Sequence, residues 1–384
     1  MKLSTDRILT THVGSLPRNA TLTDLLLRRE SGESYDREAL AQEMDRAVRH
    51  VIEQQQSAGI DVGNDGEQQR VGFQTYIPQR MTGFAGESKR NRPIDYAEFP
   101  AFAASVAQRF PRRGRSFNAP EAVGEVKYVD TSAIETEIAR IRKVTNGGNG
   151  FAEQFMTAPS PGIIATTMLN AHYDSHETYL MTLAREMRAE YRAIHDAGMV
   201  LQIDAPDLAM ERTMFFQGAS EKEFLNTCEL HVEALNVALQ DIPRESARLH
   251  CCWGNWEGPH NHDVPLETVL PVLYRANVGG LSIEFANPRH QHEYAAFKRA
   301  PLPEHFALLP GVIDSTSNFV EHPELVARRI EEAVAAVGDR ERVIASTDCG
   351  FGTFAGFEWV AEDVVWAKLK SLVEGATIAS RRLW

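Results

Sequence analysis

The chain has 384 residues, of which 43% are hydrophobic and 24% are charged. This composition is typical of a globular protein, and the lack of a long uncharged apolar segment excludes a membrane-spanning chain. The formal net charge of −13 argues against a general nucleic-acid-binding surface, so we expect neither a nucleic-acid nor a membrane partner.

The cysteine content and the first residues predict a cellular compartment. Four cysteines in a chain of this length do not make a disulfide framework. The opening MKLSTDR lacks the apolar stretch of a signal peptide. We therefore expect a cytoplasmic protein whose thiols stay reduced and free to bind a metal.

Strand-like and helix-like segments alternate along the chain, which is typical of an α/β fold. Helical patterns separate the strands, for example at 35–56 and 172–195. The pattern predicts a (β/α)8 TIM barrel, and we expect residues 1–384 to form one catalytic barrel domain. The expected strands are 8–15, 59–65, 153–158, 200–205, 247–252, 281–285, 307–314 and 342–348.

Residues 80–150 interrupt this alternation, so we expect an insertion after the second strand rather than a separate domain. The segment contains the arginine-rich stretches KRNRP and RFPRRGR, a candidate hairpin around EVKYVD at 125–130, and GGNG at 147–150. The charge run is interpreted as a solvated face. The alternative is a lid or an anion contact.

The stretch RLHCCWGNWEGPH, at 248–260, contains the most informative pair. Alternate side chains of a strand share a face, so His250 and Cys252 are expected together while Cys251 points away. Two such ligands can begin a zinc site. On this stretch alone, buried cysteines acting as small hydrophobes are an equally good account.

Chemically capable residues recur where the expected strands end, which is the face that carries the active site in barrel enzymes. Glu284 and Cys349 are the best placed partners for His250 and Cys252 in a metal site. The alternatives are a salt-bridged carboxylate for Glu284 and a buried thiol for Cys349. The residues at strand ends are Ser15, Asp65, Glu67, Asp204, His250, Cys252, Glu284, Asp348 and Cys349.

Other cysteines, histidines and tryptophans are weaker candidates for a functional role. Cys228 lies in a helical pattern, and we expect it, like Cys251, to be a packed thiol. The loop GPHNHD, with His260, His262 and Asp263, has the spacing of metal ligands, but we interpret it as a solvated loop. Substrate contact or proton donation is the alternative for this loop. Trp253 and Trp256 either wall the pocket or pack in the core.

Several of these motifs together resemble the catalytic barrel of cobalamin-independent methionine synthase, whose fold is related to the uroporphyrinogen decarboxylase barrel. They are TTHVGSLPR, GIDVGNDGEQQR, LQIDAPDL, the His-x-Cys at 250 and 252, LSIE and TDCGFG. The resemblance implies Zn2+ bound by His250, Cys252, Glu284 and Cys349. It also implies that Glu67 and Asp204 meet the amino group of homocysteine, and that Ser15 with its neighbouring backbone holds the carboxylate.

The chain departs from the family pattern on the side of the methyl donor. A length of 384 residues leaves no room for the second barrel that helps to hold folate. The loop TAPSPGIIATTM lacks the tryptophan that stacks on the pterin in the family. Asp204 is followed by Ala205 instead of the glutamate of the long enzymes, and Thr316 aligns with a histidine suggested as a proton donor.

The expected ligand set predicts the kind of reaction. Two thiolates, a carboxylate and a neutral imidazole make zinc electron-rich, which favours alkyl transfer to a bound thiol over hydrolysis. Methyl transfer to homocysteine from an unidentified methyl or alkyl donor is the first hypothesis. The second is a thiol alkyltransferase of the epoxyalkane:coenzyme M transferase type. The third is a barrel with a structural zinc, or one that catalyses metal-free decarboxylation.

Overall fold

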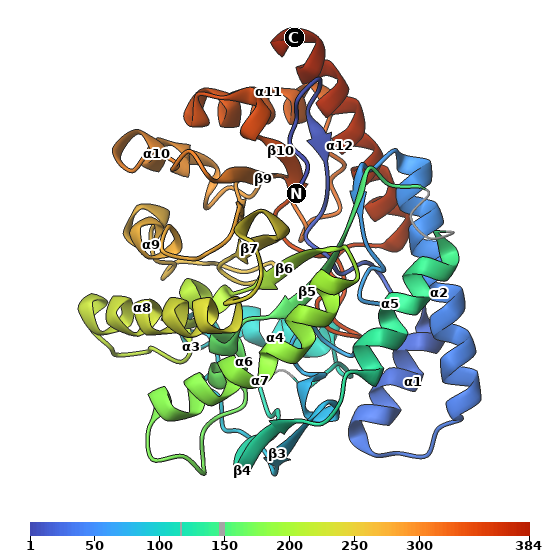
Figure 1. Ribbon diagram of the computed structural model, residues 1–384, viewed down its shortest axis with the longest axis vertical. Coiled ribbons are helices and arrows are strands. Elements are labelled where there is room, and N and C mark those ends of the chain that lie inside the picture. The colour runs from blue at the N-terminus through green and yellow to red at the C-terminus, as the bar shows by residue number, and fades with distance from the viewer. Residues whose placement is uncertain (116, 146–149) are drawn as a thin grey trace.

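The computed structural model describes residues 1–115, 117–145 and 150–384. Eight parallel strands form a nearly closed barrel with the order β1-β10-β9-β8-β7-β6-β5-β2, and helices surround it (Figure 1). The predicted (β/α)8 barrel is confirmed, and each expected strand has its counterpart. The strands are β1 Leu9–Thr10, β2 Val62–Gly63, β5 Glu153–Pro159, β6 Val200–Asp204, β7 Ala247–Cys251, β8 Gly280–Glu284, β9 Ala307–Ile313 and β10 Ile344–Thr347.

The helices begin and end at the signals that the sequence contains. Asp36 caps the helix expected at 35–56, and Ser175 caps the one expected at 172–195. Ser220 and Glu223 form a capping box at the start of α8. The helices outside the insertion are α1 Ala20–Ser31, α2 Arg37–Ala58, α6 Pro161–Thr167, α7 His176–Asp196, α8 Glu221–Ala238, α9 Leu266–Leu273, α10 Ala296–Arg299, α11 Pro323–Val337 and α12 Glu362–Leu383. Within the described part of the chain, none of the helices combines the length and the apolarity needed to cross a bilayer.

β1 and β2 are only two residues long, shorter than the expected strands 8–15 and 59–65, and side chains join them where ladder pairs are lacking. The Asp61 N–H donates to the Thr10 carbonyl at 3.2 Å, and the Asp61 carboxylate accepts from the Thr10 N–H at 2.9 Å. The Thr11 hydroxyl donates to the Val62 carbonyl at 2.9 Å. These bonds make a polar seam that closes the barrel.

A buried arginine fills the barrel beneath the strand ends. The Arg248 guanidinium lies 3.9 Å from the centre of the Phe155 ring, and it donates to the Gln202 side chain at 2.8 Å and the His12 carbonyl at 3.1 Å. The Gln202 amide donates in turn to Asp204 at 2.8 Å. Because buried polar groups require partners, this chain of hydrogen bonds fixes the base of the pocket above it.

The predicted insertion is a two-stranded ribbon and two helices. β3 Met81–Ala85 pairs antiparallel with β4 Glu121–Tyr128, which covers most of the expected hairpin strand. Between them lie α3 Ile94–Glu98 and α4 Pro100–Arg109. α5 Ser132–Val144 then packs between α2 and α7 as a helix of the barrel ring, so the extra structure ends before 132. Most of GGNG, residues 147–149, lies outside the described residues.

Several arginines of the charge run, such as Arg109 and Arg112, are exposed as expected of a solvated face, but others are buried or paired with the barrel. Arg90 is buried in an ion pair with Glu211. Arg109 stacks on the Trp359 ring at 4.9 Å and donates to the Trp359 carbonyl at 2.7 Å. The arginines therefore hold the insertion against the barrel mouth.

A buried charge network anchors the ribbon to the ring. Glu137 on α5 accepts from Arg70 at 2.8 Å and also pairs with Arg80, the residue before β3. Arg80 donates to Glu190 on α7 at 2.9 Å, and the Tyr128 hydroxyl donates to the same carboxylate. The burial of the Glu137 carboxyl opposes ionisation, but the two guanidinium groups prevail and lower its pKa.

We expect Glu137→Ala to lower the free energy of unfolding by about 3 to 5 kcal/mol, because it leaves two buried guanidinium groups without their shared anion. Urea denaturation measures the loss. Glu135→Ala, on the exposed face of the same helix, is the matched control and should cost less than about 1 kcal/mol. Equal losses in the two variants would show that the network contributes nothing.

Candidate metal centre and substrate pocket

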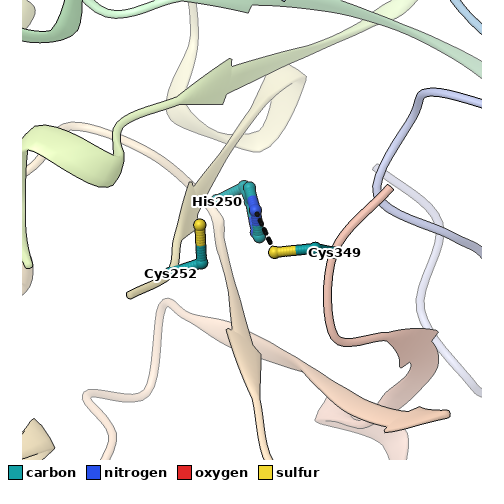
Figure 2. A group of neighbouring side chains, drawn as sticks. All are labelled: His250, Cys252 and Cys349. Atoms are coloured by element: carbon teal, nitrogen blue, oxygen red, sulfur yellow. Dashed lines mark hydrogen bonds between the residues drawn. The ribbon is translucent and has the colours of Figure 1, made fainter. Parts of the chain in front are cut away.

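Three predicted ligands converge at the carboxyl end of the barrel. His250 lies in β7, Cys252 follows the same strand, and Cys349 follows β10 (Figure 2). All three side chains are buried, and their ligand atoms lie within 4.8 Å of one another. The thiol of Cys349 and Nε2 of His250 are 3.7 Å apart. Cys251 lies in the apolar core instead, so the predicted alternation is confirmed.

The spacing of this cluster fits zinc. Zinc–sulfur and zinc–nitrogen bonds of about 2.3 and 2.05 Å at a tetrahedral angle place the two ligand atoms about 3.6 Å apart. The observed separation between Cys349 Sγ and His250 Nε2 agrees with this value. Two cysteines and one histidine are also among the usual ligands of zinc.

Glu284, the fourth predicted ligand, ends β8 but is not part of this cluster of ligand atoms. Its carboxylate accepts from the Trp253 N–H and from the Asn287 side chain, both at 2.8 Å. Burial raises the pKa of Glu284 well above its usual range, and the nearby Cys252 adds to the effect. Each carboxylate oxygen accepts one hydrogen bond and keeps a further lone pair for a metal, and ligation by Glu284 stays a prediction.

The three predicted substrate residues line one pocket with the cluster. Ser15, Glu67 and Asp204 share its wall with His250, Cys252 and Cys349. Burial raises the pKa of the Asp204 carboxyl to about 7, opposed by His250 and reinforced by the negative charge of Glu67. Burial also raises the pKa of Glu67. Two buried carboxyl groups that oppose each other's ionisation make a site suited to a cation.

Glu67 is held in an unusual backbone conformation. Its φ is +55°, in the left-handed region that few residues other than glycine adopt. The Glu67 N–H donates to Asp65 at 3.0 Å, and Arg18 donates to the Glu67 carbonyl at 2.7 Å. One carboxylate oxygen accepts from Thr157 at 2.9 Å, and the other is buried without a hydrogen-bond partner among the described residues. Strain of this kind persists where the surroundings over-determine the conformation.

Ser15 connects the first and last strand ends. Its carbonyl accepts from the Phe351 N–H at 2.7 Å, and its hydroxyl accepts from the Gly352 N–H at 3.3 Å. A Cβ on Gly350 would lie 2.0 Å from that hydroxyl, so a side chain at 350 would displace Ser15. The glycines of TDCGFG thus let the loop that carries Cys349 approach Ser15.

Apart from Trp256, the residues of the outer wall of the pocket were not predicted from the sequence. Rings from separate loops and from the insertion form an apolar vestibule above the cluster. Their positions are scattered through the chain, so no spacing could reveal them. The vestibule consists of Phe73, Tyr96, Phe117, Met210, Met214, Trp256, Phe354 and Phe357.

The two tryptophans after β7 lie in different environments, and the GPHNHD loop follows them. Trp256 lines the pocket, while Trp253 is fully buried and stacks on His290 with ring centres 4.0 Å apart. His260 contacts Asp263 at 3.0 Å and both side chains are largely buried, whereas His262 is exposed as expected of a solvated loop. Cys228 is buried in the apolar core, as expected.

Thr316 belongs to a different hollow from the metal cluster. This hollow borders Trp256, His260 and Glu284. The Thr316 hydroxyl donates to Asp314 at 2.8 Å, so it is engaged in its own turn. The structure therefore places the position aligned with the family's histidine beside Glu284.

Comparison with known proteins identifies the family. The model of the cobalamin-independent synthase catalytic domain matches residues 8–97 and 115–377. The chain belongs to this family. It is 25% identical over 404 residues to 2-hydroxypropyl-CoM lyase of Xanthobacter autotrophicus, covering 97% of this chain and 95% of that relative. It is 22% identical over 376 residues to methionine synthase of Sulfurisphaera tokodaii, covering 97% and 93%.

Solved structures agree on the fold. A B12-independent methionine synthase from Shewanella sp. W3-18-1, solved with selenomethionine, matches with a TM-score of 0.71 and 22% identity, covering 98% of this chain and 99% of that chain. A related protein from Listeria monocytogenes matches with a TM-score of 0.66 and 19% identity, covering 98% and 99%. Family membership supports an enzyme of the methionine-synthase-like transferases.

We expect the metal-free Asp204→Asn variant to be more stable than the metal-free wild type at pH 8. A carboxyl whose pKa is higher in the folded than in the unfolded state destabilises the fold above the unfolded pKa. The variant's advantage should therefore grow from about pH 4 to about pH 7 and then stay constant. Chemical denaturation across pH should show a gain of at least about 1 kcal/mol at pH 8. If Asp204→Asn is less stable than the wild type at pH 8, the raised pKa of Asp204 in the folded protein is contradicted.

Proposed function

We propose that the protein is a zinc-dependent transferase that moves a methyl group to a small thiol, with homocysteine as the acceptor. One observation carries this proposal. A buried Cys2His cluster with zinc spacing lies in the same pocket as two buried carboxyl groups, Glu67 and Asp204. A metal held by the Cys2His cluster would suit the sulfur atom of the acceptor. The two carboxyl groups would suit its ammonium group.

The metal would be held by His250, Cys252 and Cys349, with Glu284 as the fourth ligand. When bound, zinc would stabilise the substrate thiolate at neutral pH. Glu67 and Asp204 would bind the ammonium group of the acceptor and fix the direction of its sulfur. The backbone around Ser15 would take the carboxylate. Together these contacts orient the acceptor as a near-attack conformer.

The vestibule would receive the methyl donor. Its rings and the two methionines line the same pocket as the cluster and would exclude water from it. Transfer then requires the donor carbon to approach the sulfur from this side, with the leaving group in the vestibule. An apolar wall favours a donor that presents an uncharged or aromatic surface there.

A thiol alkyltransferase of the coenzyme M type is the second candidate. The relative from Xanthobacter, whose name is 2-hydroxypropyl-CoM lyase, matches along the whole chain at 25% identity. Coenzyme M has a sulfonate and no amine, so the buried carboxyl groups of Glu67 and Asp204 would disfavour it. This charge argument makes an amino-acid thiol the better acceptor.

The metal site predicts a specific pattern of loss. Cys252→Ser and Cys349→Ser should each lose most of the zinc, because each removes a thiolate ligand. Metal analysis of the purified variants measures the loss. Cys251→Ser is the control, because its side chain lies in the core and should leave the zinc content unchanged. Full zinc occupancy in both ligand variants would exclude this site.

The acceptor site predicts a selective loss of affinity. Glu67→Gln and Asp204→Asn each remove a charge-assisted hydrogen bond to an ammonium group, worth about 1.5 to 3 kcal/mol, or roughly tenfold to a hundredfold in affinity. Calorimetry should show that loss for homocysteine but little change for 2-mercaptoethanol, with the zinc content preserved.

Two other outcomes would count against this acceptor site. Equal losses for both thiols would assign the carboxyl groups a structural role. Preference of the wild type for coenzyme M over homocysteine would establish the second candidate instead.

A further inference from the structure

A second group of metal-ligating side chains lies between the insertion and the loop after β7. We call Asp95, Glu98 and His262 the α3 cluster. Asp95 and Glu98 are three residues apart on α3, so they share one face of the helix. His262 comes from the GPHNHD loop, and the ligand atoms of the three residues lie within 4.8 Å of one another. Nε2 of His262 is 2.6 Å from Glu98 Oε2.

Asp95 supplies an independent sign that a ligand belongs here. Its side chain is completely buried, and one carboxylate oxygen accepts from the Asn261 N–H at 3.1 Å. In the part of the chain that the structure describes, the other oxygen, Oδ2, is buried without a hydrogen-bond partner. A carboxylate oxygen without a donor is costly to bury, and buried carboxylates are usually paired or bound to a metal.

We propose that the α3 cluster binds a divalent transition metal ion of the zinc type, separately from the Cys2His site. An imidazole with two carboxylates suits zinc, cobalt or nickel, whereas calcium and magnesium prefer all-oxygen sites. The metal would take the place of the hydrogen bond between Glu98 and His262, and neutral His262 would bind it through Nε2 with its remaining proton on Nδ1. Water would complete the coordination.

Such a metal would fasten the insertion to the catalytic face. α3 carries Tyr96, and the loop after β7 carries Trp256, and both rings line the vestibule. The bound ion would join these two walls through Glu98 and His262. Asp95 and His262 lie within the residues that the family model matches, and Glu98 lies outside them.

Calorimetry with zinc tests the proposal on the full chain whose Cys2His site has first been loaded with one equivalent. The wild type should bind a second equivalent, and calcium or magnesium at the same concentration should not bind. Glu98→Gln and His262→Gln should each weaken this second event at least tenfold. His305→Gln, another exposed histidine, is the control and should leave it unchanged.

Cobalt distinguishes the two sites. Cobalt at the α3 cluster should lack the thiolate charge-transfer absorption of cobalt at a cysteine site, and Cys349→Ser should still bind it. The proposal would be overturned if Glu98→Gln and His262→Gln still bound the second equivalent of zinc as tightly as the wild type. Loss of this second binding event in His305→Gln would also overturn it. Absence of a second binding event in the wild type at zinc concentrations up to about 100 μM, on the order of the dissociation constant of a weak surface site, would overturn it as well.

Discussion

The two-residue periodicity of β7 is the constraint on which the site depends. His250 and Cys252 reach the pocket because they are alternate residues at the end of one strand, while Cys251 between them is buried in the core. A one-residue change of register in β7 would put Cys251 in the pocket and remove both ligands from it. The parallel pairing of β7 with β6 and β8, and of β10 with β9, therefore sets the position of the metal ligands.

Buried charge is arranged very differently around Glu137 and in the pocket, although Arg70 and Thr157 connect the two regions. Around Glu137 and Glu190, each carboxylate meets guanidinium groups, and the network holds the ribbon in place. In the pocket, Glu67 and Asp204 oppose each other's ionisation, and one carboxylate oxygen of Glu67 has no hydrogen-bond partner among the described residues. The first arrangement stabilises the fold, and the second lowers its stability, as expected if these carboxyl groups bind the proposed cation.

The sequence predicted most of the barrel because its signals are local. Strand ends, helix caps and the alternation around His250 depend on a few neighbouring residues, and the strands from β5 onward lie close to where they were expected. The convergence of Cys349 on His250 followed from the rule that barrel strands end on one face. The vestibule could not be predicted, because Phe73, Tyr96 and Phe117 come together only through the packing of the insertion. The hydrogen bonds of Glu284 also depend on backbone positions that no residue pattern specifies.

The polar seam between β1 and β2 lies beside the acceptor end of the pocket. Ser15 follows β1 and Glu67 follows β2, so these two pocket residues stand on opposite sides of the joint that Asp61 holds. Elsewhere, successive backbone hydrogen bonds join neighbouring strands, but here scattered backbone bonds alternate with side-chain contacts from Asp61, Thr11 and Arg18. A molecule that touches both Ser15 and Glu67 would act as an additional rung across this joint. Binding of such a molecule would therefore favour the closed barrel over forms in which β1 and β2 have separated.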